Sequence, residues 1–253
     1  MRKAPLRFAL LFLSFLLILS CKSDDGGPME DPRAENLKAL GTSAEDLLSD
    51  DEYTSIVVEI VYANGYRPQQ LTIDSFEIFL NDRLNKPDGI SIVETVIDAP
   101  QGKPFSIQEI REIEANNRTR YTVGDEIAVY VFFANGSSSN DTANSVTLGT
   151  AYQNTSIVIY EETIQNLNLG DFFLVEATTL RHEFGHLLGL VNIQGDDIHS
   201  DHEDPDNNKH CVVEECLMYF ASTNPGTIPN PVKGDIPPLD ELCLADLQAK
   251  GGK

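Results

Sequence analysis

The segment HEFGHLLG, residues 182–189, constrains the fold more than any other stretch of this 253-residue chain. It lies within an apolar run, residues 171–190, that we expect to form one helix with Asp171 as its N-cap. Residues four apart project from the same face of a helix, so His182 and His186 point the same way. The chain must therefore fold around a helix that offers two imidazoles to one site.

Two imidazoles four residues apart on a helix are typical of a zinc site, and Glu183 stands beside the first of them. From that position Glu183 reaches the water at a metal without being a ligand itself, as a general base does in hydrolysis. Gly189 then permits a sharp turn, because glycine adopts left-handed backbone angles at little cost. The motif predicts that His182 and His186 bind Zn²⁺ and that Glu183 is the catalytic base.

The third protein ligand that such a zinc requires is not supplied by the motif itself. Asn192 stands where the longer pattern HExxHxxGxxH has its last histidine, and a neutral amide is a poor zinc ligand. Three histidines follow in residues 193–220, namely His199, His202 and His210. We expect His199 to be a solvated loop residue, which leaves His210 and His202 as alternatives for the third ligand.

The segment HCVVEECLM, residues 210–218, resembles archaemetzincins, a metzincin family of zinc metalloproteases in which the last motif histidine is followed directly by Cys-x4-Cys-x-Met. The resemblance implies that His210 is the third zinc ligand and that residues 192–209 are an insertion. It also implies that Met218 lies in the Met-turn, the apolar floor beneath the zinc. His202 remains the alternative third ligand if the resemblance does not hold at this position.

Three cysteines follow the motif helix, and the same resemblance implies that they hold a second, structural zinc. Its ligands would be Cys211, Cys216, Cys243 and Asp246, the last standing where the family has a fourth cysteine. Zinc accepts such a Cys3Asp set, although it is less common than sets of cysteine and histidine. The alternative is a disulfide between Cys211 and Cys216, which would leave Cys243 unpaired. We favour the metal, because three cysteines are an awkward number for bridges.

Residues 196–206 are rich in aspartate and glutamate. Carboxylate oxygens are the ligands that Ca²⁺ uses, so this segment is a candidate calcium site. It lacks the spacing of an EF-hand loop, and a solvated acidic loop is the interpretation that we favour. The whole chain is acidic as well, since 18 Lys and Arg against 40 Asp and Glu give a net charge of −22. Such a chain is repelled by nucleic acid, so we expect no nucleic-acid partner.

Upstream of the motif helix, strand-like and helix-like segments alternate. We expect strands over residues 55–65, 89–97, 125–136, 145–152 and 155–162. We expect helices over residues 43–50, 68–85 and 106–118. This order predicts an α/β (α+β) domain in which helices pack on a twisted mixed sheet, and it resembles a metzincin catalytic domain. The domain would span residues 52–253, with an N-terminal part, 52–190, and an irregular, metal-stapled C-terminal part, 191–253.

Residues 1–20 are typical of a bacterial lipoprotein signal peptide. A positive start is followed by the apolar run Phe8–Leu19 and by ILSC, which resembles a lipobox cleaved before Cys21. An ordinary secretory signal is the alternative. Residues 21–51 are expected to be an acidic, flexible tether, and their KSDD resembles export signals of surface-displayed Bacteroidetes lipoproteins. These features predict a lipoprotein held in the bacterial outer membrane by lipid on Cys21 and exposed at the cell surface.

The sequence predicts a zinc-dependent endopeptidase that is anchored to the bacterial envelope and cleaves proteins or peptides. The metzincin resemblance implies that the substrate lies extended beside an edge strand before the helix, within Gly149–Tyr152 or Ser156–Tyr160. The alternative is an inactive surface lipoprotein that keeps zinc for its structure and binds a host or nutrient polymer. The presence of Glu183 favours the enzyme, because a purely structural zinc site has no use for a base.

Overall fold

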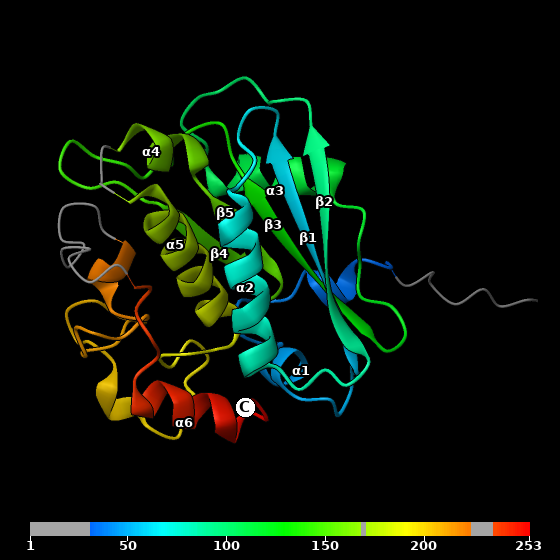
Figure 1. Ribbon diagram of the computed structural model, residues 1–253, viewed down its shortest axis with the longest axis vertical. Helices are drawn as coiled ribbons and strands as arrows, with labels where there is room; N and C mark the ends of the chain where they lie inside the picture. Colours follow the sequence, from blue (N-terminus) through cyan, green and yellow to red (C-terminus); the bar gives the residue numbers. More distant parts are fainter. Residues whose placement is uncertain (1–30, 168–170, 224–234) are drawn as a thin grey trace, which may run out of the picture. The chain divides into compact units, whose positions relative to one another are not determined.

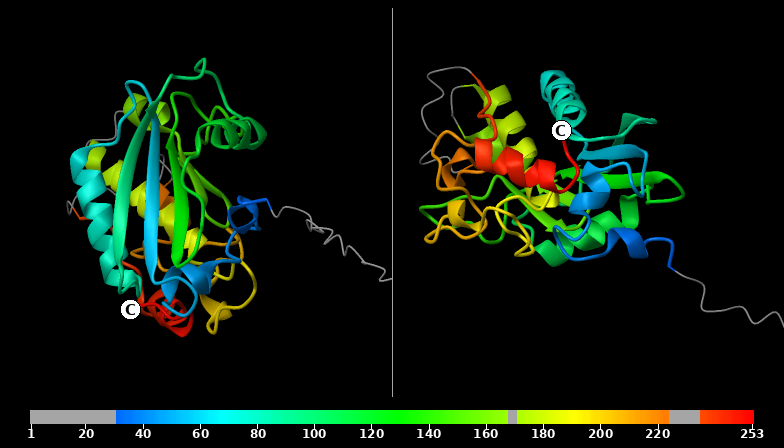
Figure 2. Two further views of the ribbon diagram at one scale, coloured as in Figure 1. Left: turned by 90° about the vertical axis from the view of Figure 1, so that its right-hand side faces the viewer. Right: turned by 90° about the horizontal axis from the view of Figure 1, so that it is seen from below.

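The computed structural model describes residues 31–167, 171–223 and 235–253. The predicted signal peptide and the lipidation site Cys21 lie outside these residues. In the described part, a five-stranded sheet has helices on both of its faces (Figures 1 and 2). The α/β (α+β) class predicted from the alternating pattern is confirmed. Within the described ranges, no helix has the length and apolarity needed to cross a bilayer.

Strands and helices alternate along the chain as far as the motif helix. The strands are β1 (Ser55–Ala63), β2 (Gly89–Ile97), β3 (Glu126–Phe133), β4 (Gly149–Gln153) and β5 (Ser156–Ile159). The helices are α1 (Ala44–Leu48), α2 (Gln70–Arg83), α3 (Ile107–Asn117), α4 (Glu161–Asn166), α5 (Phe172–Leu187) and α6 (Glu241–Ala249). Short 3-10 turns are η1 (Ala34–Asn36), η2 (Ser200–His202) and η3 (Phe220–Thr223).

The strand order in the sheet is β2-β1-β3-β5-β4, so β4 lies at one edge. Strand β1 pairs in parallel with both β2 and β3, and β3 pairs in parallel with β5. Strand β4 runs antiparallel to β5, with an irregularity in register between Ala151 and Gln153. An edge strand presents backbone N–H and C=O groups on its outer side, where another chain can pair with them.

The central strands bury both of their faces. Val129 of β3 belongs to the larger core, which β3 shares with α2 and α5, whereas Tyr130 belongs to a smaller core shared with α3. Successive side chains of a strand point to opposite faces, so the unbroken apolar run of β3 fills both cores. In the larger core, the ring of Phe184 from α5 lies 5.2 Å from that of Phe76 and 6.3 Å from that of Phe79, both from α2. These rings fix α5 against α2 over the sheet.

Four of the five predicted strands have different bounds in the structure, and only that over 89–97 is matched at both ends. The segment 145–152 becomes a strand only at Gly149, and the strand expected over 155–162 ends at Ile159. Helix α4 follows instead, beginning at Glu161. Two acidic residues, Glu161 and Glu162, stand in its first turn.

Residues 31–51 belong to the packed domain, so the tether predicted over 21–51 is wrong for this stretch. Leu47 is fully buried in the larger core. Asn36 is buried as well, and its Nδ2 donates a hydrogen bond of 2.9 Å to Ala128 O of β3. The C-terminal part, by contrast, is irregular apart from α6 and two 3-10 turns in the described residues, as predicted.

Candidate functional site

Helix α5 carries the motif, and both of its ends are fixed. The Asp171 carboxylate accepts a hydrogen bond of 3.1 Å from Phe173 N, as expected of the predicted N-cap. The helix ends at Leu187 rather than at Leu190, because Gly189 adopts a φ of +72° and reverses the chain. The motif histidines therefore stand in the last two turns of a rigid helix.

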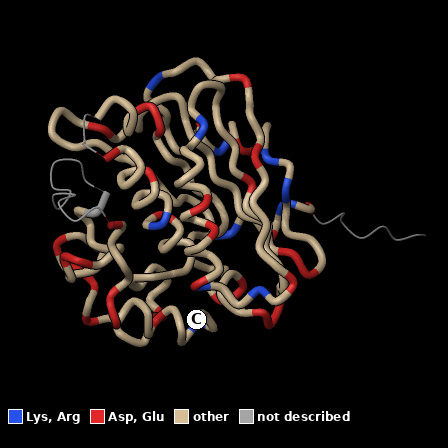
Figure 3. The backbone as a smooth tube through the Cα atoms, viewed as in Figure 1, with Lys and Arg blue, Asp and Glu red and all other residues tan. Residues whose placement is uncertain are grey.

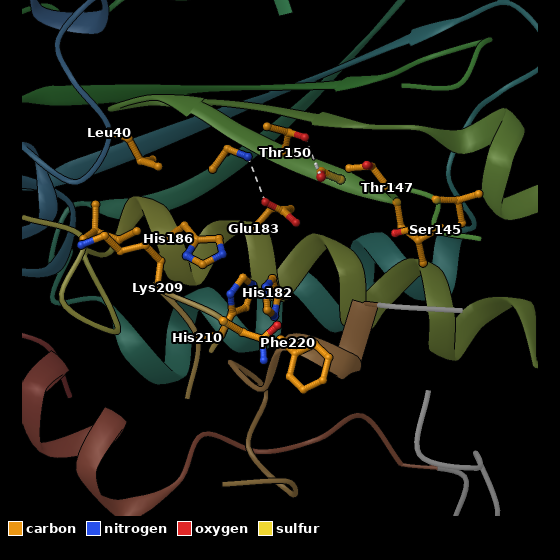
Figure 4. Close-up of a pocket in the computed structure, with 16 residues that line it drawn as sticks. Leu40, Ser145, Thr147, Thr150, His182, Glu183, His186, Lys209, His210 and Phe220 are labelled. Carbon is orange, nitrogen blue, oxygen red and sulfur yellow. Dashed lines mark hydrogen bonds between the residues drawn. The ribbon is translucent and has the colours of Figure 1, made fainter. Parts of the chain in front are cut away.

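The structure brings His182 and His186 of α5 together with His210 from the C-terminal loops (Figure 4). One ring nitrogen of each lies within 4.8 Å of the others. The ring centroids of His182 and His186 are 4.8 Å apart, and that of His210 lies 5.2 and 5.3 Å from them. His210 therefore occupies the third position that the family resemblance implied. His202, the alternative, lies in a different cluster.

The three imidazoles are held in their neutral form. Burial, with a further contribution from His210, lowers the pKa of His182 to about 3. Burial and the neighbouring histidines lower the pKa of His186 well below its usual value, and burial lowers that of His210. His182 Nδ1 donates to Leu217 O at 2.8 Å, and buried His186 Nδ1 has no hydrogen-bond partner among the described residues. Neutral imidazoles are the form of histidine that binds zinc.

Glu183 is buried beside the edge strand, and its Oε2 accepts a hydrogen bond of 2.9 Å from Ala151 N (Figure 4). Burial raises the pKa of Glu183 to about 7, against the opposing effect of this N–H group. Gly149 is what lets β4 come so close, because a Cβ at this position would lie 2.6 Å from Glu183 Cγ. Sequence reasoning missed Gly149; its only signal is a glycine within a strand-like run.

Met218 lies against the motif helix at the level of Gly185, which stands between the two histidines. A Cβ added to Gly185 would lie 2.4 Å from Met218 Sδ, and Met218 is fully buried. The thioether therefore packs directly on the helix backbone. This position fits an apolar floor for the imidazole cluster, as the resemblance implied for Met218. Gly185 was also missed, since glycine inside a helix carries no chemical signal of its own.

A cavity of about 410 Å³ lies over the imidazoles, between α5 and β4 (Figure 4). Residues 145–151 line one side of it, and Glu183 faces them from the helix. Leu40 and Phe220 add apolar surface, and Lys209 adds a cation. The cavity thus joins an edge strand, a buried carboxylate and a cluster of neutral imidazoles in one space.

Asn192 takes part in the loop structure after the helix. Its backbone has a φ of +61°, its N–H is bonded to the Asp197 carboxylate, and its Nδ2 donates to Glu203 Oε2 at 3.3 Å. Lys209 Nζ donates to its carbonyl oxygen. The chain therefore leaves the helix at Asn192 and returns to the imidazoles at His210.

The cysteines form a second cluster. Cys211, Cys216 and Cys243 are buried and free, and Cys216 Sγ lies 3.7 Å from Cys243 Sγ. The disulfide between Cys211 and Cys216 is thus not formed. The side chain of His202 enters this cluster, with Nδ1 3.5 Å from Cys211 Sγ, and the carboxylate of Asp240 lies close to it as well.

Asp246, the expected fourth ligand beside the three cysteines, is fully buried but faces two histidines. Its Oδ2 accepts from His202 Nε2 at 2.9 Å, and its Oδ1 lies 2.9 Å from His199 Nδ1. His199, expected to be solvated, is therefore anchored with its side chain 35% exposed. A buried carboxylate has to be paired, and here imidazoles pair it.

Acidic positions gather in the loop segment 196–206 (Figure 3). Asp196 Oδ1 lies 3.0 Å from Nζ of Lys250, the C-cap of α6, and Asp197 forms a second ion pair with the same amine. Glu203 accepts from Lys209 N at 2.9 Å. These contacts connect the loop to the C-terminal end of α6 and to itself.

No protein-family profile matches the sequence, and no curated protein matches it. Two similar solved structures are archaemetzincins. That from Methanopyrus kandleri has 15% sequence identity and a TM-score of 0.53, and the alignment covers 78% of this chain and 96% of that chain. That from Archaeoglobus fulgidus, solved as a complex with malonate, has 12% identity and a TM-score of 0.43, over 76% and 99% of the two chains. The first similarity shows that this chain has the archaemetzincin fold.

Proposed function

We propose that the protein is a zinc-dependent endopeptidase. One observation carries this proposal: in a single cavity, three neutral imidazoles converge next to a buried carboxylate and an edge strand. His182, His186 and His210 would hold the zinc, and Glu183 would be the base. The fold shared with an archaemetzincin supports the same reading.

A zinc ion held by these imidazoles would supply Lewis-acid chemistry to a hydrolytic reaction. Glu183 would accept a proton from the attacking water and deliver it to the leaving amine. Burial raises the pKa of Glu183 to about 7, so the carboxylate exchanges protons readily near neutral pH. The N–H group of Ala151 holds one carboxylate oxygen, which leaves the other to face the cavity.

A peptide substrate would lie extended along β4. Of the two segments considered for this role, β5 has a strand on each side, whereas β4 lies at the sheet edge. Main-chain hydrogen bonds to an edge strand align a peptide without regard to its sequence. Because the cavity adjoins β4, a paired peptide passes directly over Glu183 and the imidazoles.

Replacing Glu183 by Gln tests the proposal, with Glu77→Gln on the exposed face of α2 as the matched control. We expect cleavage of a peptide library by wild type and by the control, and a loss of at least about 100-fold in Glu183→Gln. Zinc content should be equal in all three proteins. A wild-type protein that holds zinc but cleaves no peptide would favour the alternative, an inactive surface lipoprotein that binds a host or nutrient polymer.

We also propose a structural zinc at the cysteine cluster. Three backbone N–H groups point at the sulfur atoms: Val213 N lies 3.4 Å from Cys211 Sγ, and Met218 N and Asp240 N lie 3.3 and 3.4 Å from Cys216 Sγ. Such bonds stabilise thiolates, the form that binds zinc. Metal analysis of the purified protein should then give two zinc ions per chain, and a single zinc would contradict this part of the proposal.

We further propose that lipid on Cys21 anchors the protein in the bacterial outer membrane, exposed at the cell surface. The support is the lipobox-like ILSC after the apolar run, which lies outside the described residues. Labelled fatty acid should appear on wild-type protein made in a bacterial host and be absent from Cys21→Ala. Label on both proteins, or on neither, would contradict lipidation at this position.

A further inference from the structure

The cysteine cluster contains more donor atoms than one zinc ion needs. Besides the three thiols, it includes the His202 imidazole from the loop and the carboxylate of Asp240 at the start of α6. Asp246, six residues further along the chain in α6, is where the family resemblance placed the fourth ligand. Since a structural zinc takes four ligands, only one of these three side chains completes the set.

Distances favour the imidazole. With Zn–S bonds of about 2.3 Å and Zn–N bonds of about 2.0 Å, tetrahedral angles place two sulfur atoms roughly 3.8 Å apart, and a sulfur and a nitrogen roughly 3.5 Å apart. Cys216 Sγ and Cys243 Sγ are 3.7 Å apart. His202 Nδ1 lies 3.5 Å from Cys211 Sγ and 3.9 Å from Cys243 Sγ. These atoms already have the spacing of a zinc tetrahedron.

The carboxylates are engaged elsewhere. Asp240 Oδ1 caps α6 by accepting from Leu242 N at 2.8 Å, and Oδ2 accepts from Cys211 Sγ at 3.0 Å. That is a hydrogen-bond distance, shorter than the roughly 3.5 Å between an oxygen and a sulfur on one zinc. Asp246 has both oxygens on His202 and His199. It touches the imidazole on the side away from the sulfur atoms.

We propose that His202 is the fourth ligand of the structural zinc, and that Asp246 is its positioning residue. The centre is then Cys3His, with a carboxylate that fixes the imidazole through Nε2 so that Nδ1 faces the sulfur atoms. Histidine ligands in zinc sites commonly donate their second ring N–H to such a carboxylate. The inference rests on the structural zinc proposed above and is independent of peptidase activity.

This assignment links the structural centre to the imidazole cluster. Val212 N donates to His202 O at 2.9 Å, and Asp204 N donates to His210 O at 2.7 Å. The two segments, residues 202–204 and 210–212, thus pair as an antiparallel bridge centred on Glu203 and Cys211. A zinc bound by both His202 and Cys211 would link these two segments. It would thereby help to keep His210 in place beside α5.

Reciprocal cysteine substitutions test the assignment in the cobalt-substituted full-length protein. Sulfur-to-cobalt charge-transfer absorption reports only the cysteine centre, because the imidazole cluster contains no thiolate. We expect His202→Cys to give a fourth thiolate and to raise this absorption by roughly one third. Asp246→Cys should not raise it. The opposite pattern, a rise in Asp246→Cys and none in His202→Cys, would overturn the proposal.

A second measurement does not depend on how the cysteine variants fold. Asp246→Asn keeps the size of the side chain but removes its charge, and we expect zinc to leave the cysteine centre for a chromogenic chelator about 10–100-fold faster than in wild type. His199→Ala, which also contacts Asp246 but not the sulfur atoms, is the control and should release zinc at the wild-type rate. Equal rates in Asp246→Asn and wild type would overturn the positioning role.

The zinc content of the wild-type protein distinguishes a wrong choice of His202 from the absence of a structural zinc. If wild type holds two zinc ions and the substitutions give the opposite pattern, only the choice of His202 is refuted. If wild type holds no zinc at the cysteines, the structural zinc itself is refuted, and the inference falls with it. Zinc content rather than peptidase activity decides between these outcomes, because activity is read at the other cluster.

Discussion

Replacing Gly185 by alanine tests how tightly the imidazole-bearing helix packs on Met218. The added Cβ would lie 2.4 Å from Met218 Sδ and 3.1 Å from its Cε, whereas heavy atoms in contact are roughly 3.5–4.0 Å apart. Met218 is fully buried, so its thioether has no open space to enter. A methyl group forced into a packed core costs about 1–3 kcal/mol, and alanine's higher helix propensity offsets about 1 kcal/mol. An overlap of roughly 1 Å points to the upper half of that range, so we expect a net loss of about 1–2 kcal/mol.

A double-mutant cycle with Met218→Ala isolates this contact. Met218→Ala alone should cost about 2–5 kcal/mol, because it leaves a cavity under the helix. In that background the obstructing atoms are gone, and Gly185→Ala should be neutral or stabilising by up to about 1 kcal/mol. The expected coupling energy is therefore about 2 kcal/mol, measured by urea unfolding of all four proteins at one zinc concentration. Additive effects of the two substitutions would refute the packing that we describe.

Two further predictions concern the buried carboxylates of Glu183 in α5 and Glu161 in α4. Gly149→Ala places a Cβ 2.6 Å from Glu183 Cγ, so peptidase activity should fall by about 10–100-fold; unchanged activity at normal zinc content would contradict the close approach. Burial and the neighbouring Glu176 raise the pKa of Glu161 from 4.5 to about 9. The folded chain then keeps a proton that the unfolded chain loses, so stability falls as pH rises through this range. Glu161→Gln removes that loss, and its stability advantage in urea unfolding should grow from acid to alkaline pH; a constant difference would refute the shift.

The elements that depend on local pattern could be predicted from the sequence. Helix α5 is one, because an N-cap, an apolar run and a terminal glycine all lie within one segment, and the spacing of His182 and His186 needs nothing beyond helical geometry. The beginning of α4 could not be found in this way. TSIVIYEE continues a strand pattern into two acidic residues, and Glu161 is buried there by packing against α5 rather than exposed as its charge suggests.

The structure of the loop before His210 has no comparable local signal. Val191 and Asn192 adopt φ values of +58° and +61°, which valine in particular rarely does, so tertiary packing decides the direction in which the loop leaves the helix. The resemblance grouped Asp246 with the three cysteines, and in the structure Asp246 contacts His202, which lies beside their sulfur atoms. It did not show that an imidazole stands between that carboxylate and the sulfur atoms.

With His202 as the proposed fourth ligand, the loop of residues 192–209 and the carboxylate at position 246 act together. A carboxylate is a weaker zinc ligand than the thiolate that the family resemblance expects at this position. His202 would supply the fourth donor, and Asp246, whose Oδ2 accepts from His202 Nε2 at 2.9 Å, would orient it. A shorter loop without His202 would leave the centre with three ligands and a buried, unpaired carboxylate. Cysteine at position 246 would restore a fourth ligand only in a chain that also lacks the His202 imidazole.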